Sequence, residues 1–239
     1  MTTFVLVHGA WGGSWGWRDF ANLLRADGHE VYTPSLTGQG ERVHLGGPQV
    51  NLSTHVTDVE NVFRFEELTG VTLVGHSYGG MVVTGAADRI PELIGHLVYI
   101  DAFLPRDGES CFDLGGAGGP ERATIEDGWK VMPMGARTGE PQSPEAAARL
   151  RRLSPQPLGT LEEKVRLAVP LEDRAFTLTY VKASADRPGD ANRTSAFWQA
   201  AERTKADPRW RYYELPCGHG VHREMPQELK AILDEVVAG

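Results

Sequence analysis

The pattern Gly75-x-Ser77-x-Gly79 constrains this chain more than any other part of its sequence. A short apolar run that ends at Val74 precedes it and has the length and composition of a buried strand. The apolar run that begins at Met81 has the length of a helix. Glycines are needed on both sides of such a serine, because a Cβ at either position would collide with the neighbouring strand or helix. We therefore predict a tight, strained strand-to-helix turn that presents the Ser77 hydroxyl above a sheet, at a helix N-terminus.

Strands and helices alternate along most of the chain. The expected strands are short apolar runs at residues 4–7, 31–33, 71–74, 97–100, 175–181 and 210–215. This alternation predicts an α/β domain with a mostly parallel, doubly wound sheet, whose core comprises residues 1–104 and 171–239. Residues 105–170 contain scattered glycines and prolines and weak strand signals. We expect this segment to be an inserted helical cap over a cleft.

Composition and charge exclude several classes of function. The net charge of −8 and the lack of a basic stripe argue against a nucleic-acid surface. No apolar segment reaches membrane-spanning length, and the N-terminus does not resemble a signal peptide. Cys111 and Cys217 follow no metal or redox spacing, so we expect a reduced, cytoplasmic setting. His219 and His222 are three residues apart without a third ligand, so we expect no metal site. The sequence leaves open whether the chain is a monomer or a homodimer.

A serine hydroxyl becomes a good nucleophile only beside a base, and that base needs an orienting carboxylate. Ser77, Asp186 and His219 occur in the order that serine hydrolases of α/β type use, nucleophile, acid and base. Asp186 and His219 both follow predicted strands, at the sheet edge where open α/β sheets bind ligands. Asp190 and Asp101 are alternative acids, although we expect Asp101 to cap or turn the backbone after its strand.

The glycine-rich turn after the first strand is a second part of the predicted site. Such a turn can direct backbone N–H groups into a cleft, and we assign the oxyanion donors to Ala10 and Tyr78. We expect His8 to hold this turn by hydrogen bonding. Aromatic residues and a methionine near the turn and in the insertion are candidates to contact a small-molecule ester substrate, although those in the insertion could equally form its own small core: Trp11, Phe103, Phe112, Trp129 and Met132.

Several motifs resemble one branch of the α/β-hydrolase superfamily, which holds plant methyl esterases and hydroxynitrile lyases. The resemblance lies in FVLVHGAW at residues 4–11, in GHSYGG at 75–80 and in the run from Tyr180 to Asp186. Small bacterial esterases of this branch, some of which act on carbamate methyl esters such as carbendazim, also share TGQGER at 37–42 and DAF at 101–103. The resemblance implies a Ser-His-Asp triad, no cofactor and a small aromatic or acyl substrate.

The same branch offers two reactions. Its lyases carry a threonine where Gly9 stands and a lysine where Gly220 stands, and this chain has neither. The expected function is therefore that of a serine hydrolase, which cleaves a small carboxylic or carbamate ester through an acyl-enzyme. Two alternatives stay open: a hydroxynitrile-lyase-like or cyclase activity at the same Ser/His site, and a ligand-binding receptor with a vestigial triad.

Overall fold

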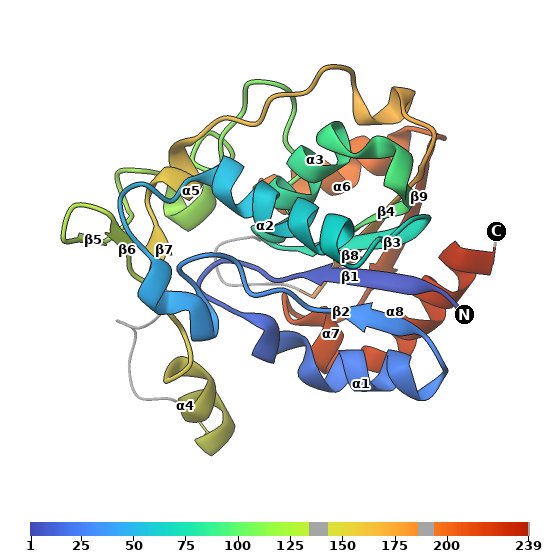
Figure 1. Ribbon diagram of the computed structural model, residues 1–239, viewed down its shortest axis with the longest axis horizontal. Helices are drawn as coiled ribbons and strands as arrows, with labels where there is room; N and C mark the ends of the chain where they lie inside the picture. The colour runs from blue at the N-terminus through green and yellow to red at the C-terminus, as the bar shows by residue number, and fades with distance from the viewer. Residues whose placement is uncertain (134–142, 186–193, 239) are drawn as a thin grey trace.

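Six parallel strands form the central sheet of the computed structural model, which describes residues 1–133, 143–185 and 194–238. Their order is β2-β1-β3-β4-β8-β9, and every pairing among them is parallel. The strands run from right to left in Figure 1, so their carboxyl ends meet at the left edge of the sheet. The predicted parallel α/β architecture is confirmed. The strand bounds are β1 Thr3–Val7, β2 Glu30–Tyr32, β3 Val71–His76, β4 Ile94–Ile100, β8 Thr177–Ala183 and β9 Trp210–Leu215.

Helices cover both faces of the sheet (Figure 1), as a doubly wound fold requires. The upper layer in that view contains α2 Leu52–Phe65, α3 Gly79–Arg89 and α6 Ala196–Ala206. The lower layer contains α1 Arg18–Ala26, α7 Val221–Glu224 and α8 Pro226–Ala238. Each layer buries its own apolar cluster against the sheet. Short 3-10 helices complete the connections: Ser14–Trp17, Gly40–Leu45, Pro91–Leu93, Gly116–Gly118 and Leu171–Asp173.

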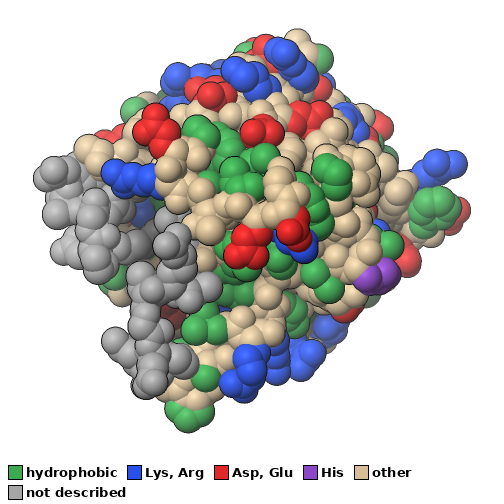
Figure 2. Space-filling view, turned by 90° about the vertical axis from the view of Figure 1, so that its left-hand side faces the viewer, with side chains coloured by type: hydrophobic (Ala, Val, Ile, Leu, Met, Phe, Trp, Pro, Cys, Tyr) green, Lys and Arg blue, Asp and Glu red, His purple; other side chains and the backbone are tan. Residues whose placement is uncertain are grey.

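The segment 105–170 lies at the carboxyl end of the sheet (Figure 1). It contains a small antiparallel sheet of β5 Ile125–Glu126, β6 Lys130–Val131 and β7 Gln156–Pro157, and two short helices, α4 Pro144–Leu150 and α5 Gly159–Glu162. It is therefore mixed rather than only helical, since strands of two residues leave no periodic signal in a sequence. Figure 2 looks at this end of the molecule and shows hydrophobic side chains gathered in its middle.

Within the part of the chain that is described, no helix combines the length and the hydropathy that crossing a bilayer requires.

Candidate active site

Ser77 occupies the turn between β3 and α3. Its φ angle is 57°, which lies in the left-handed region that side chains other than glycine rarely adopt. A Cβ at Gly75 would lie 2.7 Å from the Val83 side chain, and one at Gly79 would lie 2.6 Å from the Val7 carbonyl oxygen. Both contacts are too close for a real side chain, so the strand and helix can approach this tightly only at glycine. The predicted strained turn is confirmed.

His219 bridges the Ser77 hydroxyl and a carboxylate. Its Nε2 lies 2.9 Å from Ser77 Oγ, and its Nδ1 lies 2.6 Å from Asp101 Oδ2. These distances allow the serine hydroxyl to donate to Nε2 while Nδ1–H donates to the carboxylate. The three side chains come from loops after β3, β9 and β4, which end at the same edge of the sheet. Residues far apart in sequence thus form one hydrogen-bonded chain.

The carboxylate of Asp101 is also paired with a lysine. Lys182 Nζ lies 2.8 Å from Asp101 Oδ1, and both side chains are fully buried. The register of the sheet explains the pairing, because Ile100 on β4 lies opposite Val181 on β8 and the next residue of each strand follows side by side. Lys182 Nζ also donates to the Ala183 carbonyl and lies 4.2 Å from the centre of the Trp198 ring.

Asp101 has a larger role here than its sequence context indicated. The expected turn is present at Asp101, and its two carboxylate oxygens also contact His219 and Lys182, as the alternative role of acid requires. Its φ of 41° does place it in a turn, and this turn directs the side chain toward the imidazole. Asp186 and Asp190 lie outside the described residues, so the role expected of Asp186 stays a prediction.

His76 fixes the backbone that carries the imidazole. Burial lowers the pKa of His76 well below its usual value, so this ring is neutral and its Nε2–H donates to the His219 carbonyl at 2.7 Å. The Phe197 ring packs 5.1 Å from the His219 ring, centre to centre. Sequence reasoning assigned His76 no function. Its position directly before the nucleophile was the only signal, and that position does not reveal what the far side of the ring contacts.

The backbone amides of Ala10 and Tyr78 both belong to turns next to Ser77. Neither amide donates to an acceptor among the residues that the structure describes. A Cβ at Gly9 would lie 2.8 Å from Ser77 Cβ, so the glycine lets the first turn approach the serine closely. His8 holds this turn as expected, because its Nε2 accepts from the Leu36 amide at 3.1 Å. Burial lowers the pKa of His8 to about 4.

Trp11 ties the same turn to the inserted segment. It has a φ of 61°, and its backbone N–H donates to Gln156 Oε1 at 3.2 Å. Its indole Nε1–H donates to the Val131 carbonyl at 2.9 Å, and its own carbonyl accepts from the Ser154 amide at 3.0 Å. Gln156 is fully buried and also bonds Gln39 and Thr160. Gln156 therefore has a structural role at the site that sequence reasoning missed.

Tyr78 is anchored from its side chain as well. Burial lowers the pKa of His55 to about 4, so that ring is neutral. His55 Nε2–H donates to the Thr37 carbonyl at 2.8 Å, which leaves Nδ1 to accept from the Tyr78 hydroxyl at 3.0 Å. This buried chain of hydrogen bonds links the 37–42 motif to the residue that follows the nucleophile.

A hollow of about 250 Å³ lies against Ser77 and His219. Among the predicted substrate contacts, Trp11 lines this hollow. Phe103, Phe112, Trp129 and Met132 are not among the described residues that line it. Phe103 packs on Phe197, Phe112 belongs to the apolar core, and the Met132 amide, just after β6, donates to the Thr124 carbonyl. Contact of these four with a substrate stays a prediction.

Comparisons with known proteins identify the family of this chain. A model of the alpha/beta hydrolase family matches residues 4–232. A carbendazim hydrolyzing esterase of Nocardioides sp. (strain SG-4G) is 40% identical over 244 residues, which cover 96% of this chain and 97% of that protein. An alpha-hydroxynitrile lyase of Arabidopsis thaliana is 35% identical over 108 residues, which cover 43% of this chain and 40% of the lyase.

A solved structure shares the fold of this chain. The crystal structure of the methylesterase MES16 from Arabidopsis superimposes with a TM-score of 0.76 at 23% sequence identity, and the match covers 100% of this chain and 99% of that one. At this identity the likeness shows a shared fold.

Proposed function

Because this chain belongs to the alpha/beta hydrolase family, we propose that it is a serine esterase whose catalytic triad is Ser77, His219 and Asp101. The observation that carries the proposal is the continuous hydrogen-bonded chain from the serine to the acid, with distances of 2.9 and 2.6 Å. This is the arrangement that turns a hydroxyl into a nucleophile. The esterase that matches nearly the whole chain supports the same activity.

Ser77 starts the reaction by attacking the ester carbonyl carbon. His219 Nε2 takes the proton from Ser77 Oγ, and Asp101 stabilises the imidazolium that forms. The N–H groups of Ala10 and Tyr78 donate to the carbonyl oxygen as it gains negative charge. Each such donor is worth roughly 3 kcal/mol in the transition state of comparable enzymes. His219 then gives its proton to the departing alcohol, which leaves Ser77 acylated.

Water completes the cycle. His219, neutral again, takes a proton from a water molecule as that water attacks the acyl carbon, and then returns the proton to Ser77 as the acid leaves. The hydrogen bond from His76 to the His219 carbonyl holds the backbone of His219, and so keeps its imidazole in place, in both half-reactions. The inserted segment 105–170 acts as the cap of this site, since its β6 and β7 hold the turn at Trp11.

Small carboxylic or carbamate esters are the proposed substrates, in line with the carbendazim hydrolyzing relative. Lyase chemistry is the less favoured reading of the same site. The threonine of the lyase pattern would have to stand at Gly9, where a Cβ comes within 2.8 Å of Ser77 Cβ. The lysine of that pattern is absent, because Gly220 stands at its position.

Active-site labelling together with Ser77→Ala tests the proposal. We expect a fluorophosphonate to label Ser77 once per chain, and Ser77→Ala to lose both labelling and about 10⁶-fold in turnover of a p-nitrophenyl ester. Ser53→Ala is a matched control, because the Ser53 hydroxyl bonds Glu163 and lies outside the hollow. Turnover that survives in Ser77→Ala at the level of the control would contradict the proposal.

A further inference from the structure

Two arginines line the hollow that contains Ser77 and His219. Arg149 comes from α4 in the inserted segment, and Arg223 comes from α7 just after His219. A Cβ at Gly220 would overlap the Arg223 guanidinium. The glycine after His219 therefore leaves the space that this guanidinium occupies, which brings a fixed positive charge next to the backbone of the catalytic base.

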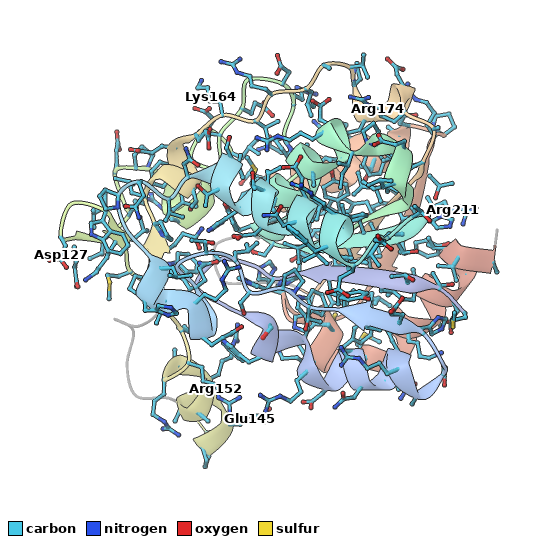
Figure 3. The ribbon with its side chains drawn as sticks, viewed as in Figure 1. Asp127, Glu145, Arg152, Lys164, Arg174 and Arg211 are labelled. Atoms are coloured by element: carbon cyan, nitrogen blue, oxygen red, sulfur yellow. The ribbon has the colours of Figure 1, made fainter. Side chains whose placement is uncertain are left out.

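Within the described residues, neither guanidinium has a counter-ion in contact. Across residues 1–133, 143–185 and 194–238, no hydrogen bond or ion pair joins the side chain of Arg149 or Arg223 to another group. The charges of Glu145 and Glu224 act on Arg223 without direct pairing. Glu224 is already engaged, since its Oε2 accepts from the Gly218 amide at 2.7 Å. Figure 3 labels Glu145 at α4.

The two positive charges are close enough to affect one another. Desolvation lowers the pKa of both guanidinium groups, and the charge of Arg149 lowers the pKa of Arg223 further. Both are exposed residues overall, so this desolvation is local to the side of the group that faces the protein. Arginine stays protonated nonetheless. Two adjacent cations without a contacting anion form an arrangement that an anionic ligand would stabilise.

The other basic groups around the hollow do not supply this charge. His8, His76 and His222 also line it, and burial lowers the pKa of each, to about 4 for His8 and to about 3 for His222. These rings are neutral near pH 7. The whole chain carries a net charge of −8 and so repels anions at long range. The arginine pair is thus a local source of positive charge in the hollow that Ser77 also lines.

We propose that Arg149 and Arg223 form a carboxylate subsite beside Ser77, so that the preferred esters carry an anionic group on their acyl or alcohol part. This inference rests on the proposed esterase activity and narrows its substrate class. An arginine fork matches the two oxygens of a carboxylate, and a pair of forks from α4 and α7 can grip it from two sides. The volume of about 250 Å³ suits a small ester acid rather than a long chain.

Matched ester pairs test the subsite. The first arm uses the monomethyl esters of succinic, glutaric and adipic acid, and the second uses acetate esters of short hydroxy acids, so the two arms place the anion on opposite sides of the ester bond. Each is compared with a neutral ester in which an isopropyl group replaces the carboxylate at equal size. We expect kcat/KM to be at least about tenfold higher for the anionic partner in one arm, as one charge-assisted contact allows, and this preference to fall at high salt.

Variants assign the preference to these side chains. Arg149→Gln and Arg223→Gln should each lower the anionic-to-neutral ratio of kcat/KM by about threefold or more, mostly through KM. Arg152→Gln is the control, because Arg152 stacks over Trp15, is labelled near α4 in Figure 3, and is not among the described residues lining the Ser77 hollow. It removes the same charge nearby and should leave the ratio unchanged.

The outcomes separate this inference from the proposed function. If the wild-type protein hydrolyses neutral and anionic partners equally well in both arms, the subsite is wrong and the esterase stands. If Arg152→Gln lowers the ratio as much as the other two variants, the effect is a general one of surface charge and the subsite is also wrong. If no ester of either kind is hydrolysed and the fluorophosphonate leaves Ser77 unlabelled, the esterase proposal itself fails.

Discussion

Asp101 and Lys182 form a fully buried ion pair directly behind the His219 imidazole, with 2.8 Å between Oδ1 and Nζ. The carboxylate therefore divides its two oxygens between the imidazole of His219, the proposed base, and the ammonium group of Lys182. A buried carboxylate needs such partners, because an unpaired charge in the protein interior is costly. The pair also sets the geometry, since one oxygen of Asp101 contacts Lys182 on β8 and the other contacts His219 in the loop after β9.

Replacing each candidate acid by asparagine tests whether Asp101 or Asp186 is the acid of the triad. Asp101→Asn keeps the size of the side chain but no longer orients His219 as the base, so we expect kcat to fall by about 10³- to 10⁴-fold. Asp186→Asn is the competing variant, and steady-state kinetics with one p-nitrophenyl ester measure both. A loss of that size in Asp186→Asn, with Asp101→Asn near wild type, would restore the acid that the sequence order indicated.

Lys182→Met should leave Asp101 buried without its cation. We expect the free energy of unfolding to fall by about 3 kcal/mol, measured by urea denaturation. In the double variant Lys182→Met with Asp101→Asn, the loss of stability should be smaller than the sum of the two single losses. Additive losses would show that the pair does not interact energetically.

Gln156→Leu removes the acceptor that holds the Trp11 amide. We expect unfolding to become easier by about 1–3 kcal/mol, the usual cost of a buried polar group without its partner. Loosening of the turn should also lower kcat about tenfold, with little change in KM, because the Ala10 amide acts mainly in the transition state.

Thr160→Val is the control for Gln156. It removes the partner of Gln156 Nε2 and leaves the contact with Trp11 in place. It should lower stability while kcat stays near wild type. Equal losses of kcat in the two variants would show that the effect reflects a general loss of packing in the inserted segment.

Stability should fall as the solution becomes mildly acidic. Burial lowers the pKa of His8 and His55 from 6.5 to about 4 in the folded chain. Below pH 6.5 the unfolded chain therefore takes up protons that the folded chain refuses, and unfolding is favoured until the pH reaches about 4. Each such histidine contributes a slope of at most about 1.4 kcal/mol per pH unit in that window.

Urea denaturation between pH 7 and pH 4.5 measures this slope. His55→Gln should reduce the slope of the unfolding free energy against pH by up to about 1.4 kcal/mol per pH unit, the contribution of one proton. His44→Gln, at an exposed histidine, should leave the slope unchanged. The same slope in wild type and His55→Gln would mean that carboxylates alone govern acid unfolding.

Much of the fold was predictable from local pattern. Apolar runs of strand length alternate with helical periodicity, and this alternation leads to a parallel sheet because only a helix-length crossover joins parallel neighbours. The turn at Ser77 was equally predictable, since the need for Gly75 and Gly79 arises from contacts within a few residues of the serine and with the adjoining strand. The two-residue strands of the inserted segment were beyond such reasoning, because they are too short to show a period.

The sequence by itself determined the candidate nucleophile, its turn and the histidine that follows the last strand, because each is marked by glycines and apolar runs beside it in the chain. Only the tertiary structure decided which carboxylate meets that histidine. The register of β4 against β8 places Asp101 beside Lys182 and under the imidazole. Tertiary structure likewise decided the hydrogen bond between Gln156 and the Trp11 amide, and the position of Arg149 and Arg223 at the hollow. These contacts join segments that are distant in the chain. Such a pairing depends on how the segments pack in three dimensions, and the local sequence of either segment does not predict it.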